Sequence, residues 1–92
     1  VLTQSVAIML YLAEKTGRLI PDDPRERWAM LEALMLAASD VAGTNTALNQ
    51  LVRSAPDKSA ANLAFFEERL LKYFRACEAR LASGPYLAGA LS

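Results

Sequence analysis

Two small polar side chains stand directly before an apolar stretch near the start of the chain. Gln4 and Ser5 lead into a run that predicts a helix from about Gln4 to Lys15. The N–H groups of a first helical turn lack partners inside the helix, and the helix dipole leaves that end partly positive. A carboxylate can therefore bind there without Lys or Arg, with added hydrogen bonds from Gln4 and Ser5. A Ser at a helix start is also a common cap, so an ordinary cap remains the alternative.

Asp40 is the carboxylate best placed to contact a second helix. On a helical wheel it lies about 120° from Trp28. It shares its face with small or apolar residues, namely Ala29, Ala33 and Leu36. Small residues there allow another helix to approach, and Asp40 could then accept a hydrogen bond from a cation. A solvated Asp is the alternative, because exposed Asp is common.

The other residues of chemical interest are apolar. Five apolar residues are candidates for one wall of a substrate pocket, although apolar residues at helical spacing more often form a core: Trp28, Met30, Leu31, Leu34 and Met35. Cys77 lies in an apolar stripe, which favours core packing over reactivity. The chain has no His and a single Cys, which excludes Cys/His metal clusters, Ser-His-Asp triads and Cys-His pairs within it. We therefore expect neither a catalytic residue nor a metal site in this segment.

Composition narrows the class of protein and its partners. The 92 residues suit one small domain, and 53% of them are apolar. Ten basic and ten acidic residues are interspersed, so we expect neither nucleic acid nor an anionic membrane as a partner. No apolar run is long enough to span a bilayer, and no signal peptide is evident. A single Cys cannot form an internal disulfide, which fits a reducing compartment, and we expect a cytoplasmic protein.

Three helices are predicted along the chain. The first ends at Gly17, a residue suited to the left-handed position after a helix. Its apolar residues point in several directions, so it needs cover on several sides and indicates a missing layer. After a connector over residues 18–22, a second helix begins with Asp23 as cap, Pro24 at the first position and Glu26 at the third.

The second and third helices should form an antiparallel amphipathic pair. The second carries a stripe within roughly 80° that turns away later in the helix, which predicts a bend near residues 43–46. That stripe comprises Trp28, Leu31, Met35, Ala38 and Ala42, whereas Leu48 and Val52 lie on a rotated face. The third helix should run from Ser59 to Ser83. Its stripe comprises Leu63, Phe66, Leu70, Phe74, Cys77 and Leu81. The fold class is therefore all-α: two long helices plus a short N-terminal one.

The pattern Q-S-x-A-I-x-x-Y-L-A-E-K from Gln4 to Lys15 resembles the segment of bacterial-type cytosolic glutathione transferases that holds the γ-glutamyl end of glutathione. Gly17-Arg18-Leu19-Ile20-Pro21, the helix start at Pro24 and the closing run from Pro85 to Ser92 extend the resemblance over the whole chain. It implies the last helix of a thioredoxin-like domain over residues 1–17 and a linker over 18–22. Residues 23–92 would be an incomplete all-helical C-terminal domain, with Ser92 capping a further helix.

The resemblance also implies roles for individual residues. Gln4 and Ser5 would contact the α-amino and α-carboxylate groups of glutathione, and Asp40 would reach its amino group across a homodimer interface. Trp28 and Met35 would line the site of an apolar electrophile. Glutathione would be a co-substrate, with no other cofactor. The residue that stabilises the thiolate lies outside the segment, so the segment alone would be inactive, and the parent enzyme could be a transferase or a disulfide reductase.

Two other classes of function stay open. A glutathione-transferase-like module can serve protein assembly without catalysis, although such a scaffold would not need Gln4 and Ser5. A stand-alone helical dimerisation domain unrelated to the family is the third possibility. Under this possibility the resemblance of the whole run to the family would be a coincidence.

Overall fold

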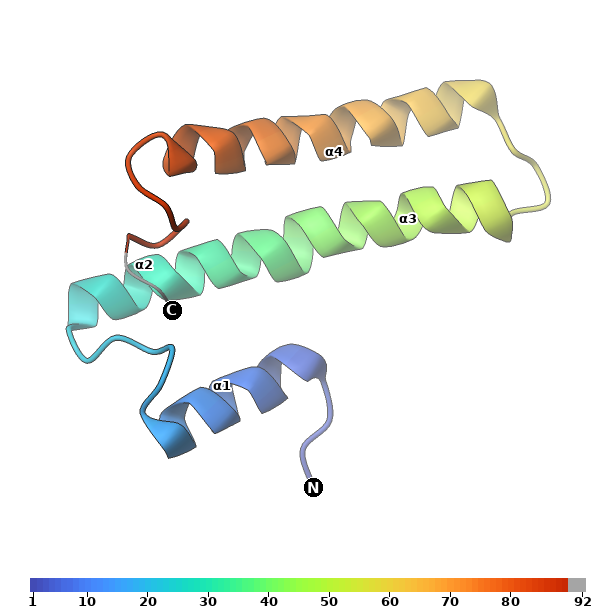
Figure 1. Ribbon diagram of the computed structural model, residues 1–92. Helices are drawn as coiled ribbons and strands as arrows, with labels where there is room; N and C mark the ends of the chain where they lie inside the picture. The colour runs from blue at the N-terminus through green and yellow to red at the C-terminus, as the bar shows by residue number, and fades with distance from the viewer. Residues whose placement is uncertain (90–92) are drawn as a thin grey trace.

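The chain forms helices and no strand in the computed structural model, which describes residues 1–89 (Figure 1). The helices are α1 (Ser5–Thr16), α2 (Pro24–Met35), the π-helical η1 (Leu36–Val41), α3 (Ala42–Arg53) and α4 (Ala60–Leu81). Because α2, η1 and α3 follow one another without a break, they make one long rod. The prediction of an all-α fold with a short N-terminal helix and two long ones is confirmed for residues 1–89.

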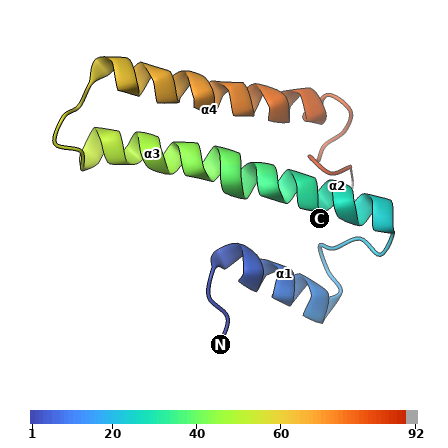
Figure 2. The same ribbon diagram turned by 180° about the vertical axis from the view of Figure 1, so that it is seen from behind.

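The long rod and α4 run antiparallel, joined by a loop over residues 54–59, as both views show (Figures 1 and 2). The side of α4 that faces the rod carries half-buried residues, namely Leu63, Phe66, Leu70, Tyr73 and Cys77. Most of the predicted stripe is therefore at this contact. Phe74 and Leu81 were expected in the same stripe but are exposed; Phe74 lies at the edge of the stripe, and Leu81 is the last residue of α4.

Local signals in the sequence set the ends of the helices. Gly17 follows α1 in the left-handed conformation with φ 64°, which costs a residue without Cβ little. The carboxylate of Asp23 accepts from the backbone N–H groups of Arg25 and Glu26, both at 3.1 Å. The Ser59 hydroxyl oxygen accepts from the N–H of Asn62 at 3.2 Å. These helix starts and stops agree with those predicted from the sequence.

The long rod changes its helical phase earlier than the sequence indicated, and without the expected bend at residues 43–46. The change falls at η1, where the N–H of Ala42 donates to the carbonyl of Ala37, five residues back. A π-helical turn takes up an extra residue and so rotates the faces before and after it relative to each other. The prediction of a bend near Gly43 was therefore wrong in place and in kind.

The expected core stripe of the second helix is also wrong for three of its members, since Trp28, Met35 and Ala42 are exposed. Trp28 is 71% exposed and Met35 is 45% exposed, whereas Met30 and Ala33 are each only 7% exposed. Trp28 and Met30 lie about 160° apart around the helix axis. The neighbouring segments pack on the Met30 side, which helical periodicity alone could not indicate.

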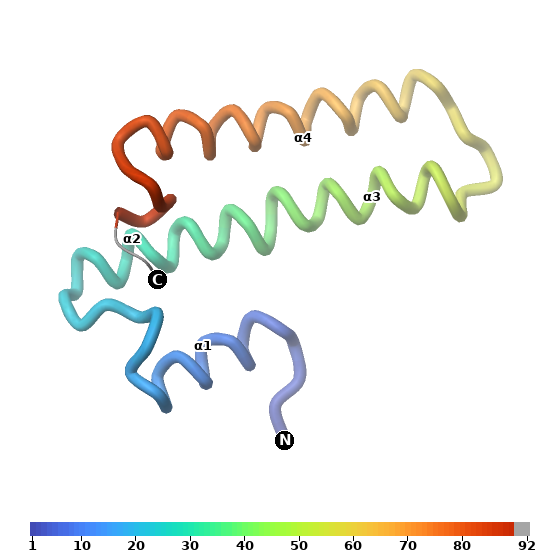
Figure 3. Tube along the Cα trace, viewed as in Figure 1, coloured from blue at the N-terminus to red at the C-terminus, as the bar shows by residue number. Residues whose placement is uncertain are grey.

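The helices lie side by side (Figure 3), and together they form a thin layer. Its principal extents are 47 × 38 × 16 Å. Since a helix with its side chains is about 10–12 Å wide, the short dimension holds little more than one helix. No residue of α1 is buried, in keeping with the expected need for further cover. The domain boundaries near residues 17 and 22 stay predictions, and the expected cap at Ser92 lies outside the described residues.

Candidate functional site

Gln4 caps α1, and Ser5 is the first helical residue. The carbonyl of Gln4 accepts from the N–H of Ile8 at 3.1 Å, which closes the first turn. No side chain makes a capping hydrogen bond at this helix start. The simple reading of Ser5 as the cap is therefore wrong, because its hydroxyl is not used in that way.

The start of α1 differs from the starts of α2 and α4, the other two helices that follow loops. Asp23 satisfies two N–H groups of α2, and Ser59 satisfies one of α4. At α1, the first-turn N–H groups have no side-chain acceptor among the described residues. These donors and the partly positive end of the helix are thus available to a carboxylate brought from outside.

Gln4 also has an unusual backbone. Its dihedral angles are φ 72° and ψ 116°, in a region that residues with a Cβ seldom adopt. Holding such a conformation costs on the order of 1–3 kcal/mol, and strained residues cluster at binding and active sites. Composition gives no warning of this strain, because Gln is not a residue type that favours positive φ. The structure thus adds an independent feature at a residue singled out by the sequence.

Asp40 lies in η1 and is half-buried. Within residues 1–89 its carboxylate takes part in no hydrogen bond or ion pair, and no such interaction joins it to Gln4 or Ser5. Single π-helical turns are frequent at functional sites. The carboxylate is therefore free to accept from an outside cation, but the structure does not bring it together with the start of α1.

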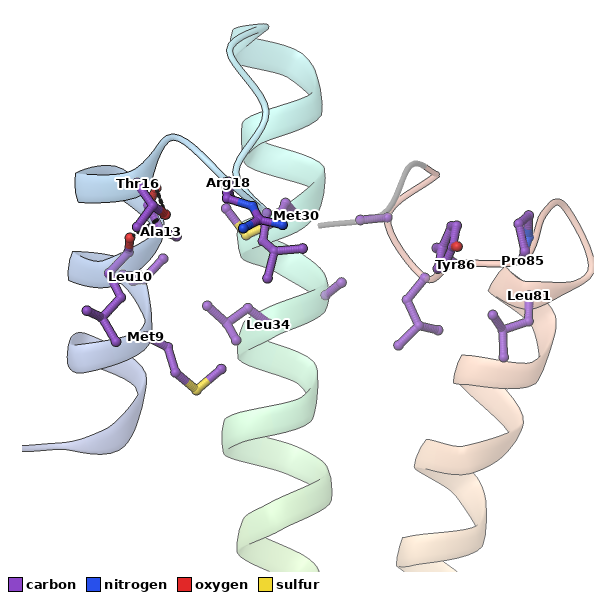
Figure 4. Close-up of a pocket in the computed structure, with 15 residues that line it drawn as sticks. Met9, Leu10, Ala13, Thr16, Arg18, Met30, Leu34, Leu81, Pro85 and Tyr86 are labelled. Carbon is purple, nitrogen blue, oxygen red and sulfur yellow. Dashed lines mark hydrogen bonds between the residues drawn. The ribbon is translucent and has the colours of Figure 1, made fainter.

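Trp28 and Met35 do not line the concave surface that α1, α2 and the C-terminal part form together. This surface, called the apolar hollow below, has a volume of about 880 Å³ and extends over α1, α2 and the end of α4 (Figure 4). Its walls include Met9 and Ala13 from α1, Met30 and Leu34 from α2, and Leu81 and Tyr86 from the C-terminal part. Of the five pocket candidates on α2, Met30 and Leu34 line this surface, whereas Trp28, Leu31 and Met35 do not. The sequence did not predict the walls that α1 and the C-terminal part contribute, although the all-round apolar character of α1 was a signal for them.

Two ion pairs tie the walls of the apolar hollow together. Arg27 of α2 pairs with Glu14 of α1, and Nη2 of Arg80 lies 2.6 Å from Oε1 of Glu32. Both pairs are largely open to water, where an ion pair contributes up to about 1 kcal/mol. They orient α1 and α4 against α2 but cannot replace an apolar core.

The described residues offer few other sites. No three His, Cys, Asp or Glu side chains within residues 1–89 are grouped so that they could hold a metal ion. None of the described helices combines the length and apolarity needed to cross a bilayer. Even α4, at 22 residues, carries charges such as Glu67 and Arg69 along its length.

Comparison with models of known protein families gives no match for this chain, and neither does a search of curated proteins. The resemblance to glutathione transferases therefore stays a prediction. It rests on the residue pattern alone.

Proposed function

We propose that the chain is part of a glutathione transferase and that the start of α1 binds the γ-glutamyl end of glutathione. The observation that carries the proposal is the strained backbone of Gln4 beside a helix start that no side chain caps. Strain of this kind persists where function demands it, and an uncapped helix start is a natural partner for a carboxylate. Both features fall on the residues for which the sequence pattern predicts glutathione contacts.

The γ-glutamyl end carries a carboxylate and an ammonium group, and each has a matching group here. The first-turn N–H groups and the Ser5 hydroxyl donate to the carboxylate. The side-chain carbonyl of Gln4 accepts from the ammonium. Asp40 of a second subunit adds a charge-assisted acceptor for the same ammonium. Binding therefore needs no cationic side chain from this segment.

The reaction of the parent enzyme depends on the thiolate of bound glutathione. Lowering the pKa of that thiol raises the fraction of the nucleophilic form at neutral pH. The residue that stabilises the thiolate belongs to the thioredoxin-like part outside this segment. The residues of this segment serve conjugation to an electrophile and disulfide reduction equally well.

Trp28 and Met35 are the proposed contacts for an apolar electrophile. Both side chains are open to solvent and lie on the same side of α2, about 20° apart. Trp28 is the single Trp of the chain, so its fluorescence reports on this surface alone. Quenching by an aromatic electrophile in the presence of glutathione supports the contact, and unchanged fluorescence at saturation refutes it.

The binding proposal is tested with halves of glutathione, in the protein with its natural flanking sequence. Titration calorimetry should show that γ-glutamylcysteine binds and that cysteinylglycine does not, because only the first carries the γ-glutamyl end. Ser5→Ala should weaken binding of glutathione about tenfold, the usual effect of losing one hydrogen bond to a charged group. Asp40→Ala should weaken it by a similar factor if the second subunit contributes that carboxylate.

Ser54→Ala is the matched control. Ser54 is an exposed serine directly after α3, at the end of the long rod away from α2. Its replacement by Ala should leave glutathione affinity unchanged. Equal binding of both glutathione halves, or equal affinity of Ser5→Ala and the unaltered protein, contradicts the proposed site. Unchanged affinity in Asp40→Ala removes the role of Asp40 alone.

A second candidate function is a glutathione-transferase-like module that serves assembly without catalysis. The observation that favours it is the amount of apolar side chain left open to solvent on α1, α2 and α4. Large exposed apolar patches mark interaction sites. A protein that binds partners through this surface and shows no affinity for γ-glutamylcysteine fits this alternative.

A further inference from the structure

Arg69, near the middle of α4, is held in place by its own helix and not by an acid. Its guanidinium lies 5.7 Å from the centre of the Phe65 ring, and its Nη2 donates to the Tyr73 hydroxyl at 3.1 Å. These three residues are spaced four apart, so their side chains follow one another along one side of the helix. Within residues 1–89 no ion pair joins Arg69 to a carboxylate, whereas the other two arginines of α4 each have an acidic partner. The remaining N–H groups of Arg69 are therefore ordered and available to an acceptor from outside.

Phe65 gives this cation an apolar neighbour that is open to solvent. It is 56% exposed. Its ring packs edge-on against Phe66, with the centroids 5.3 Å apart and the planes at 87°. Phe66 is half-buried on the side that meets the long rod, so Phe65 is fixed from within the molecule. The same side of α4 thus presents an ordered planar cation next to an anchored aromatic ring.

The surface around Arg69 is basic. An arc of about 100° of α4, called the basic face below, includes Phe65, Arg69, Lys72, Tyr73 and Arg80. The three acids of α4 are Glu67, Glu68 and Glu78, and they lie about 90° or more from the middle of this arc. Because Arg80 is paired with Glu32, the uncompensated charge of the basic face is that of Arg69 and Lys72.

We propose that the basic face binds an acidic segment of another protein, in which an apolar residue is followed closely by carboxylates. The apolar side chain packs on Phe65, one carboxylate accepts from Arg69, and a second pairs with Lys72. A guanidinium offers parallel N–H groups that match a carboxylate through two hydrogen bonds. Phe65 and Lys72 are about 10 Å apart along α4, which is the length of three residues of an extended chain.

The charges of the chain favour a short acidic segment over a polyanion. Nucleic acids and anionic membranes are bound through many cations. The basic face has two that are uncompensated, and the net charge of the chain is zero. A peptide carboxylate needs only one guanidinium, and the aromatic ring beside it limits the access of water to the ion pair. The occupant that matches the basic face is therefore an acidic protein segment.

A titration followed by amide NMR shifts, in the protein with its natural flanking sequence, tests the proposal. The probe is the peptide Gly-Leu-Glu-Asp-Glu-Gly with both ends blocked. The same peptide with Gln and Asn in place of its acids is the uncharged control. The acidic peptide should bind with a dissociation constant below about 1 mM, and more weakly as salt is added. The amide signals around Phe65, Arg69 and Lys72 should shift, and the uncharged peptide should not bind.

Arg69→Gln should raise the dissociation constant about tenfold or more, because it removes two hydrogen bonds to a charged group. Arg69→Lys keeps the charge but loses the planar fork, so it should also weaken binding, about threefold or more. Arg75→Gln is the matched control, since Arg75 lies on the same helix about 120° away and pairs with Glu68. It should leave the dissociation constant within about twofold, as for a residue outside an interface. Gln is a good helix former, so far-UV circular dichroism should show both variants folded.

Failure of the acidic peptide to bind at about 1 mM overturns the proposal, and so does equal binding of the uncharged peptide. An equal effect of Arg69→Gln and Arg75→Gln also contradicts it. If phosphatidylserine vesicles bind through Arg69 and the peptide does not, a membrane is the occupant and the proposal is overturned. Arg69→Gln should leave the affinity for γ-glutamylcysteine unchanged, so this proposal and the glutathione site can fail independently of each other.

Discussion

Gln4 is the residue at which sequence and geometry meet. The sequence pattern singles it out as a contact for glutathione, and the structure gives it a backbone conformation that costs stability. Leu19 is the other non-glycine residue with positive φ among those described, and it lies in the connector after α1. The strain at Gln4 differs in being next to donors that no side chain satisfies. The effect of this strain on stability can therefore be measured separately from its effect on binding, by substitution of Gln4.

Gln4→Gly should stabilise the protein and weaken its binding of glutathione. Glycine adopts φ near 72° without the steric cost. The free energy of unfolding, measured in urea, should therefore be about 1 kcal/mol higher in this variant. Loss of the side-chain amide removes the acceptor for the ligand ammonium. Gln50→Gly, in the last turn of the regular helix α3, is the control and should lose up to about 1 kcal/mol. A loss of stability at both positions would show that Gln4 is not strained.

Residue type alone predicted the structural role of some positions and not of others. Asp23, Pro24 and Gly17 each have a strong local preference, and the structure places them as expected. Gln4 has no such preference, so its conformation results from the chain around it. The use of Asp40 and Ser5 by a ligand depends on groups outside the described chain and stays a prediction.

At the scale of the elements, the helix starts separate structural capping from ligand binding. Asp23→Ala removes an acceptor for two N–H groups and should lower the free energy of unfolding by about 1 kcal/mol. Ser5→Ala should change it by only a few tenths, because no capping bond of Ser5 is lost. Thermal and urea unfolding of both variants measures the difference. If Ser5→Ala costs as much as Asp23→Ala, Ser5 acts as a cap in solution.

The packing faces of the helices were only partly predictable. Helical periodicity placed Leu63, Phe66 and Leu70 correctly on the side of α4 that meets the rod. It misplaced Trp28 and Met35, because a wheel groups apolar residues but cannot say on which side the neighbouring segments lie. The apolar hollow was predicted only in part: Met30 and Leu34 were pocket candidates, but the walls from α1 and from the C-terminal part come from segments far apart in the sequence and were not foreseen.

At the scale of the whole molecule, the small core limits what one chain can achieve. Only Met30 and Ala33 are buried apolar residues within the described chain, and the ion pairs around them are exposed. Burial of apolar area is the main favourable term in folding, so a single layer should be only marginally stable.

The π-helical turn at η1 acts as a one-residue spacer in the long rod. The part before it presents Met30 and Ala33 to the hollow, while the part after it presents Leu48 and Leu51 as half-buried residues. Deletion of a single residue between positions 36 and 41 would turn α3 by about 100° relative to α2. The two ends of the rod would then no longer serve their separate neighbours, so the length of this segment is constrained even where its residue types are not.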